Sequence, residues 1–199
     1  MIFATANKHK LREMRELLPE LDLIALPEGF ELPPEDGESF AAIALDKARA
    51  AHAASGEAAI GDDSGIEASG LSGQPGIRSA RYGGPNASDA ENLAKLLREV
   101  SKAGEDRRAA YHCALALVET DGAERVFEAR CEGYLIERPR GEGGFGYDPA
   151  FVPDDTGTDD ERTMSELSQT EKNGISHRGR AAKLLAAHLS ADEATSRTR

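Results

Sequence analysis

The chain has 199 residues, of which 39% are hydrophobic and 30% are charged. This length and composition predict a soluble globular protein with a real core, and no apolar run approaches the length that crosses a membrane. The formal net charge is −12, which argues against a surface that binds long nucleic acid or an anionic membrane. A small anionic ligand can still bind where lysines and arginines gather locally.

Helix and strand patterns alternate along the first half of the chain. Residues 2–6 read as a strand, 11–18 as a helix with Leu and Met at spacings of three and four, and 21–26 as a second strand. Ser39 can cap a helix over 40–55, and Ala58-Ala59-Ile60 reads as a short strand. Ser88-Asp89-Ala90-Glu91 is a capping box that predicts a helix to about residue 100.

The second half predicts a hairpin, a short strand and a final helix. Residues 109–118 and 126–136 read as strands joined at Asp121-Gly122, a good hairpin signal. Residues 150–152 read as a strand and 177–189 as the last helix. No repeat or linker is visible, so we expect a single domain over 1–190 and a frayed C-terminal tail over 191–199. The antiparallel pair among mixed elements predicts an α/β fold with a mixed central sheet.

Two adjacent carboxylates, Asp62 and Asp63, follow the strand at residues 58–60, and Gly61 would let the chain bend as the strand ends. Side chains alternate along an extended segment, so the two carboxylates should point to opposite sides. With Glu35 in an earlier loop, they offer oxygen ligands from separate segments, which suits a Mg²⁺ ion that also binds phosphates. The alternative is an ordinary polar turn.

The segment Thr5-Ala6-Asn7-Lys8-His9-Lys10 lies where the first strand gives way to the first helix. A helix start has unpaired backbone N–H groups and the positive end of the helix dipole, which suits phosphate. Two lysines add charge, and Thr5 and Asn7 add hydrogen-bonding groups. The alternative is a capped helix with solvated lysines.

A glycine-rich loop carries Phe145, Tyr147 and Asp148, which offer two aromatic faces for a base and one acceptor. Lys172 and the helix start Ser176-His177-Arg178 add donors that suit an anion or a base carbonyl. The alternatives are a tight turn with its aromatics in the core and a capped, solvent-facing helix start.

The order of these motifs resembles that of the inosine triphosphate pyrophosphatase family, hydrolases of non-canonical purine nucleoside triphosphates. The motifs are Thr-x-Asn-x-x-Lys, Asp-Asp-Ser-Gly, Pro-Gly-x-x-Ser-Ala-Arg-Tyr, Gly-Gly-Phe-Gly-Tyr-Asp-Pro and Ser-His-Arg, over residues 5–178. The resemblance covers nearly the whole chain. It implies an elongated α/β domain with a mixed sheet, flanking helices and a substrate cleft, usually paired as a homodimer.

The resemblance also implies roles for single residues. Asp63 matches the general base and metal ligand, Glu35 falls at a metal-binding glutamate, and Asp62 is a further candidate ligand for the Mg²⁺ cofactor. The matching substrate contacts are Thr5, Ala6, Asn7, Lys8, His9, Lys10, Ser64, Phe145, Gly146, Tyr147, Asp148, Lys172, His177 and Arg178. The chain departs from the family at two places. It has Phe40-Ala41-Ala42-Ile43-Ala44 where the family commonly has Phe-x-Glu-Asn-Ala, and Ala6 and His9 where glycines are common in the first motif.

The predicted function is therefore hydrolysis of inosine, deoxyinosine and xanthosine triphosphates (ITP, dITP and XTP) to the monophosphate and pyrophosphate, which cleanses the nucleotide pool. A pyrophosphatase for pyrimidine or modified nucleotides, or a nucleotide-binding module without turnover, are the alternatives. Cys113 and Cys131 lie in apolar contexts without metal spacing, and the N-terminus lacks a signal peptide pattern. We therefore expect buried free thiols and a cytoplasmic location.

Overall fold

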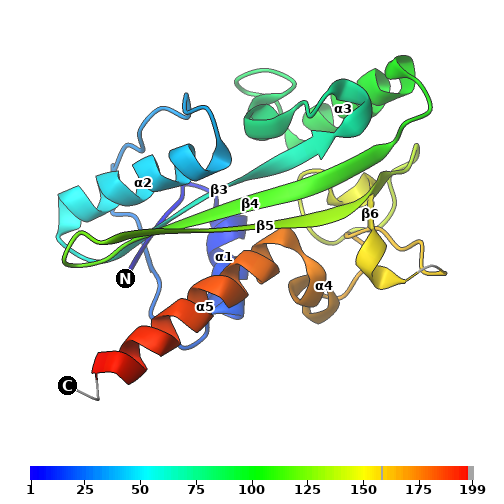
Figure 1. Cartoon of the computed structure of the whole chain (residues 1–199). Helices are drawn as coiled ribbons and strands as arrows, with labels where there is room; N and C mark the ends of the chain where they lie inside the picture. Colours follow the sequence, from blue (N-terminus) through cyan, green and yellow to red (C-terminus); the bar gives the residue numbers. More distant parts are fainter. Residues whose placement is uncertain (158, 197–199) are drawn as a thin grey trace. The chain divides into compact units, whose positions relative to one another are not determined.

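The computed structural model describes residues 1–157 and 159–196 (Figure 1). Its strands are β1 (Ile2–Ala4), β2 (Ile24–Ala25), β3 (Ala59–Ala68), β4 (Arg108–Val118), β5 (Glu124–Leu135) and β6 (Phe151–Pro153). Its α-helices are α1 (Lys8–Leu17), α2 (Phe40–Ser55), α3 (Asp89–Ala103), α4 (Gln169–Ile175) and α5 (His177–Ser196). Short 3₁₀ helices are η1 (Ser69–Leu71), η2 (Gly76–Arg81), η3 (Asp148–Ala150) and η4 (Asp154–Thr156).

In the described part of the chain, the strands form a sheet in the order β2-β1-β3-β4-β5-β6. Strand β1 pairs in parallel with both β2 and β3, whereas β5 pairs with β6 antiparallel. The predicted mixed sheet is therefore confirmed. The predicted strand at 21–26 is shorter in the structure, where β2 contains only Ile24–Ala25.

The chain divides into two compact units, each with its own core. Unit 1 contains Met1–Asp63, Cys113–Ala129 and the segment from Arg178 onward, and unit 2 contains Ser64–His112 and Arg130–His177. The prediction of a single domain over residues 1–190 stays a prediction, as do the elongated outline and the cleft.

Strand β1 and residues 59–63 of β3 are buried on both faces, as is usual for parallel strands. Helices α1, α2 and α5 lie on either side of these strands (Figure 1). Phe3 and Ile60 pack with the apolar residues of α1 and α5 on one face. Ile2, Ala4 and Ala59 pack with Ala51 of α2 on the other face. The helices therefore flank the strands of this unit, and the Ala-rich sequence of α2 allows it to lie close to the sheet.

Unit 2 is built around α3 and the parts of β3, β4 and β5 that belong to it. Its core includes the buried side chains of Ile66, Leu96, Tyr111, Leu135 and Phe151. The Ser88 capping box starts α3 as the sequence predicted. A second capping box, from Ser168 to Glu171, starts the short helix α4, which the sequence analysis did not predict.

The sequence pattern predicted that the third strand ends near Gly61. In the structure, β3 continues to Ala68. Asp62 and Asp63 therefore lie within a strand and not in a turn. A Cβ atom at Gly61 would lie 1.9 Å from the backbone oxygen of Ala44, because α2 passes directly over the strand. The glycine serves this close approach and not a bend.

Helix α5 continues to Ser196, beyond the predicted helix end at residue 189. The frayed tail over 191–199 stays a prediction. No glycine or proline occurs after Gly179 to end the helix, and several alanines favour its continuation. Residues 197–199 of the predicted tail lie outside the described residues.

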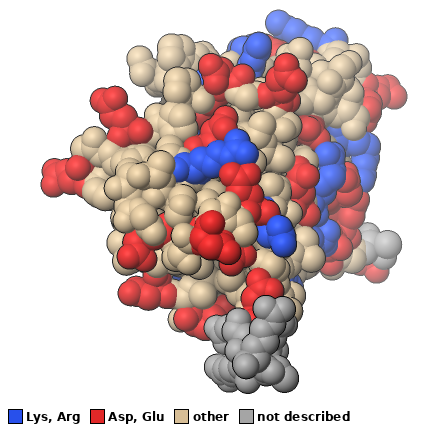
Figure 2. All heavy atoms as spheres, turned by 60° about the vertical axis from the view of Figure 1, so that its left-hand side comes forward, with Lys and Arg blue, Asp and Glu red and all other residues tan. Residues whose placement is uncertain are grey.

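Acidic side chains are spread over the face of the molecule in Figure 2, and the lysines and arginines lie among them in small groups. This distribution agrees with the formal net charge of −12. Within residues 1–157 and 159–196, none of the helices combines the length and the apolar character needed to cross a membrane.

We predict that Gly61→Ala lowers the free energy of unfolding by about 1–3 kcal/mol, the usual cost of overpacking, because its Cβ would collide with the backbone of α2. Urea denaturation measures this loss. Gly174→Ala is the matched control, since a Cβ at this position in α4 meets no atom within 4 Å. Equal stability losses in the two variants would contradict the packing argument.

Candidate functional site

Asp62 is fully buried on β3, and two cations hold its carboxylate. Lys10 of α1 donates to Oδ1, and Arg178 Nε of α5 donates to Oδ2 at 2.8 Å. Arg178 Nη1 also donates to Glu13 Oε2 at 2.7 Å. Burial alone would raise the pKa of Asp62, but the charges of Arg178 and Lys10 outweigh it and hold this pKa well below its usual value. Asp62 therefore stays ionised and ties α1 and α5 to the strand.

Asp63 points to the opposite face from Asp62, toward α2, as the alternation along a strand predicted. Lys47 Nζ donates to Asp63 Oδ1 at 2.9 Å and forms an ion pair with Glu35 Oε1 at 2.5 Å. Burial raises the pKa of Asp63 above its usual value, against the charge of Lys47. Within the described residues, Asp63 Oδ2 is buried without a hydrogen-bond partner. This oxygen is the unsatisfied acceptor of the site.

Lys47 is a site residue that the sequence analysis missed. It lies on the buried face of α2 together with Ile43, Ala44 and Ala48. Burial alone would lower the pKa of Lys47, but Asp63 and Glu35 raise it, so the ammonium keeps its charge. A single lysine among apolar residues at helical spacing was the available signal, because a buried cation needs a buried anion.

Ile43 replaces a residue that is commonly polar in the family that the sequence resembles, and it packs against the loop that carries Glu35. A Cβ at Gly37 would lie 2.9 Å from Ile43 Cγ1. The loop therefore passes tightly over the start of α2, where Ser39 Oγ accepts a hydrogen bond from the backbone N–H of Ala42 at 3.1 Å. An apolar contact and a helix cap place Glu35 near Lys47 in this chain.

The side chains of Glu35 and Asp63 offer carboxylate oxygens, which are suitable ligands for a magnesium ion. Both carboxylates lie close to the Lys47 ammonium, and within the described residues Asp63 Oδ2 has a lone pair that no hydrogen bond uses. Mg²⁺ commonly takes one or two protein carboxylates together with substrate phosphates. Asp62 is different, because Lys10 and Arg178 engage both of its oxygens. We therefore leave Asp62 out of the candidate metal site.

The predicted phosphate segment forms the capped start of α1. Asn7 Oδ1 accepts hydrogen bonds from the backbone N–H groups of His9 at 2.9 Å and Lys10 at 3.3 Å. Thr5 Oγ1 accepts from the Asn7 N–H at 3.2 Å. The members of the segment that are exposed are Ala6, Asn7, Lys8 and His9. The helix start is thus confirmed, and its contact with phosphate stays a prediction.

In unit 2, the buried carboxylate of Asp148 organises a second group of predicted site residues. Lys172 Nζ donates to Oδ2 at 2.8 Å, and the backbone N–H of Phe145 donates to the same oxygen at 3.0 Å. The Tyr111 hydroxyl donates to Oδ1 at 3.0 Å. The Lys172 ammonium also lies 5.0 Å from the centroid of the Phe145 ring. Asp148 therefore fixes both a cation and an aromatic ring.

Tyr111 was not predicted from the sequence, although it supports two predicted residues. Besides Asp148, it stacks on His177, with ring centroids 4.5 Å apart and an interplanar angle of 4°. Burial raises the pKa of Tyr111 well above its usual value, so its hydroxyl keeps its hydrogen. An apolar strand pattern conceals this residue, because tyrosine is common in strand cores.

Three further predicted contacts have different surroundings in the structure. Tyr147 is buried in the core of unit 2, and its hydroxyl donates to the backbone oxygen of Ser79 at 2.7 Å, as the alternative reading of the loop expected. The backbone N–H of Gly146 donates to Asp89 Oδ2 at 2.9 Å. Ser64, the first residue of unit 2, is partly exposed on β3.

Arg178 is 2% exposed, and Asp62 and Glu13 engage its guanidinium. The structure thus gives Arg178 a supporting role toward Asp62. The predicted contact between Arg178 and a base stays a prediction.

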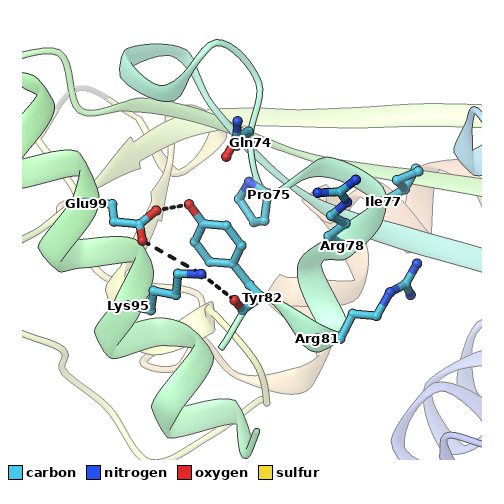
Figure 3. Close-up of a pocket in the computed structure, with 8 residues that line it drawn as sticks. All are labelled: Gln74, Pro75, Ile77, Arg78, Arg81, Tyr82, Lys95 and Glu99. Carbon is cyan, nitrogen blue, oxygen red and sulfur yellow. Dashed lines mark hydrogen bonds and ion pairs between the residues drawn. The ribbon is translucent and has the colours of Figure 1, made fainter. Parts of the chain in front are cut away.

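A pocket of about 710 Å³ in unit 2 contains none of the predicted site residues (Figure 3). It is lined by Gln74, Pro75, Ile77, Arg78, Arg81, Tyr82, Lys95 and Glu99. The Tyr82 hydroxyl donates to Glu99, and Lys95 donates to the backbone oxygen of Tyr82 at 2.7 Å. The Pro-Gly-x-x-Ser-Ala-Arg-Tyr motif, residues 75–82, therefore contributes to this pocket. Ser79 of the same motif accepts a hydrogen bond at Oγ from the backbone N–H of Ile66 at 2.9 Å.

Comparisons with known proteins agree with the resemblance seen in the sequence. A sequence model of the Ham1 family matches residues 1–188. The chain is 44% identical over 194 residues to a dITP/XTP pyrophosphatase of Geobacter sulfurreducens, covering 95% of this chain and 96% of the relative. It is 45% identical over 193 residues to a dITP/XTP pyrophosphatase of Mycolicibacterium paratuberculosis, covering 93% of each chain.

Solved structures show the same fold. A HAM1 protein from Coxiella burnetii matches with a TM-score of 0.84 and 40% identity, covering 96% of this chain and 98% of that one. A nucleoside-triphosphatase / dITP/XTP pyrophosphatase from Mycobacterium abscessus matches with a TM-score of 0.72 and 40% identity, covering 92% and 96%.

We predict that Tyr111→Phe lowers the free energy of unfolding by about 1–3 kcal/mol, because it removes the hydroxyl that satisfies the buried Oδ1 of Asp148. Chemical denaturation measures the change. Tyr134→Phe, at a partly exposed position on β5, is the matched control and should leave stability nearly unchanged. A loss that is no larger at Tyr111 than at Tyr134 would contradict the role of this hydrogen bond.

Proposed function

We propose that this chain, which belongs to the Ham1 family, is a pyrophosphatase that hydrolyses ITP, dITP and XTP to the monophosphate and pyrophosphate. The names of its relatives support this substrate class, and they do not favour a pyrimidine nucleotide or binding without turnover. The structural observation that carries the proposal is Asp63, a buried carboxylate with one oxygen held by Lys47. Among the described residues, its other oxygen has no hydrogen-bond partner.

Asp63 Oδ2 accepts the proton of the attacking water. The water oxygen bonds to the α-phosphorus, the bond from this phosphorus to the bridging oxygen breaks, and pyrophosphate leaves. Lys47 keeps the carboxylate in one orientation through Oδ1.

Glu35 and Asp63 hold Mg²⁺ in this proposal, which their shared approach to one ammonium supports. When bound, the ion offsets the charge that develops on the phosphate oxygens. The start of α1 supplies a positive helix end and Lys8, Lys10 and Asn7 for the remaining phosphate oxygens. These cations allow a protein of net charge −12 to bind a polyanion.

The Asp148 group recognises the base. Phe145 offers a ring face on which the base can stack, and Lys172 and His177 supply hydrogen-bond donors for a carbonyl oxygen of the base. Purines of ITP, dITP and XTP carry an oxygen at the six position, whereas adenine carries an amino group that would face these donors. A site that hydrogen-bonds one pattern rejects the mismatch, because buried polar groups are then left unpaired.

The proposed setting is the cytoplasm, with a nucleotide as the partner and no long nucleic acid. Cys113 and Cys131 are both buried, which agrees with a reducing compartment. The homodimer is proposed on the family resemblance, and light scattering of the purified chain tests it.

We predict that Asp63→Asn lowers kcat by about 10²–10⁴-fold, the usual loss for a general base, while the fold is retained. The assay is Mg²⁺-dependent release of pyrophosphate from ITP, with circular dichroism as the check on folding. Asp36→Asn is the matched control, because Asp36 is exposed in the loop that carries Glu35. Turnover near that of the unmodified chain at saturating Mg²⁺ would contradict the assignment.

We predict that Lys10→Met raises KM for ITP, and that the increase is larger at low than at high ionic strength because salt screens the lysine–phosphate attraction. Stability should also fall by about 3–5 kcal/mol, since the substitution removes one of two cations from buried Asp62. Lys8→Met, at an exposed position, should affect KM less and leave stability unchanged. An unchanged KM of Lys10→Met at low salt would place the phosphates elsewhere.

A further inference from the structure

We propose that Glu119, His188 and Asp192 form a second metal site, which binds a divalent transition-metal ion of the Zn²⁺ type. Their ligand atoms all lie within 4.8 Å of one another. All three residues belong to unit 1, and none of them belongs to the proposed catalytic site. The inference therefore stands independently of the proposed function.

The backbone places these ligands before any ion binds. Glu119 directly follows β4, and two backbone hydrogen bonds of the turn fix its main chain. The Glu119 N–H donates to the backbone oxygen of Ala123 at 2.9 Å, and the Gly122 N–H donates to the backbone oxygen of Glu119 at 3.0 Å. His188 and Asp192 are four residues apart on α5, so they lie on one side of the helix. The His188 ring also contacts Phe127, with centroids 5.5 Å apart.

Two carboxylates approach the same ring nitrogen. His188 Nε2 lies 3.4 Å from Glu119 Oε1 and 3.2 Å from Asp192 Oδ2. This nitrogen carries at most one hydrogen in any state of the ring, so it cannot donate a straight hydrogen bond to both carboxylates. A cation at the point where the three atoms converge satisfies all of them.

The ligand set selects the class of ion. One imidazole nitrogen and two carboxylate oxygens suit Zn²⁺, which takes such ligands in tetrahedral sites and can complete its coordination with water. Mg²⁺ prefers oxygen ligands alone. The side chains of His188, Glu119 and Asp192 are 19%, 34% and 53% exposed, so an ion can reach them from solvent. The bound ion would join the later part of α5 to the β4–β5 turn.

The experiment measures Zn²⁺ bound to the chelator-treated full chain by equilibrium dialysis, for the unmodified chain and four variants. His188→Gln and Asp192→Asn alter the proposed ligands. His52→Gln is the matched control, because His52 is a surface histidine whose Nδ1 lies 2.9 Å from the backbone oxygen of Glu57. Asp63→Asn separates this site from the proposed magnesium site. The melting temperature with and without Zn²⁺ is the second measurement.

We expect the unmodified chain, His52→Gln and Asp63→Asn to bind the same amount of Zn²⁺. His188→Gln and Asp192→Asn should each bind about one Zn²⁺ fewer per chain, as a three-ligand site requires. Zn²⁺ should raise the melting temperature of the proteins that retain the site and not that of His188→Gln. Equal Zn²⁺ binding by His188→Gln and His52→Gln would overturn the proposal. It would also be overturned if the unmodified chain bound no Zn²⁺, or if only Asp63→Asn lost the ion.

Discussion

Unit 1 depends on the ion pairs that form on the two faces of β3. Asp62 and Asp63 are adjacent on a buried strand, so the alternation of side chains sends one negative charge to each side. Each charge needs a cation from the helices on its own face, and Lys10, Arg178 and Lys47 supply them. Removing one partner of such a pair costs about 3–5 kcal/mol, which is a large share of the stability of a domain. The charges therefore join the apolar contacts in fixing α1, α2 and α5 against the sheet.

The two carboxylates are not equivalent, and the difference separates structure from chemistry. Both oxygens of Asp62 accept hydrogen bonds from cations, which lowers its pKa and leaves it little to offer a ligand. Asp63 shares one ammonium with Glu35, and in the part of the chain that the structure describes its buried Oδ2 has no hydrogen-bond partner. Such an unsatisfied acceptor is costly to bury, and it can be offset when substrate, metal or water binds. In the proposed function, this incomplete pairing is the reason that Asp63 and not Asp62 acts as the base.

Short sequence motifs predicted the elements that begin at a strong helix cap or are joined by a tight turn. The helix over 40–55 starts at the Ser39 cap, the Ser88 capping box starts α3, and the turn at Asp121-Gly122 joins β4 to β5. The continuation of β3 beyond Gly61 was not predictable, because it depends on cations that come from positions 10, 47 and 178. For the same reason Lys47 and Tyr111 were missed: one resembles a surface lysine and the other a core aromatic until the partners that they contact are known. Charge, helix-start and glycine-rich-loop patterns singled out most of the candidate site residues, and the resemblance assigned their individual roles.

The Asp148 group in unit 2 follows the principle that governs Asp62, with a consequence for selectivity. The carboxylate accepts from Tyr111 at one oxygen, and from Lys172 and the Phe145 N–H at the other. Three of its roughly four acceptor positions are thus in use, so it acts mainly to hold donors in place. Asp148 was predicted as an acceptor for the base, and this contact stays a prediction; its hydrogen bonds show that it also supports Lys172. In the proposed function, the engaged carboxylate leaves donors for the base, and donors favour an oxygen at the six position over an amino group. In this interpretation the preference for six-keto purines comes from the pairing of one buried carboxylate.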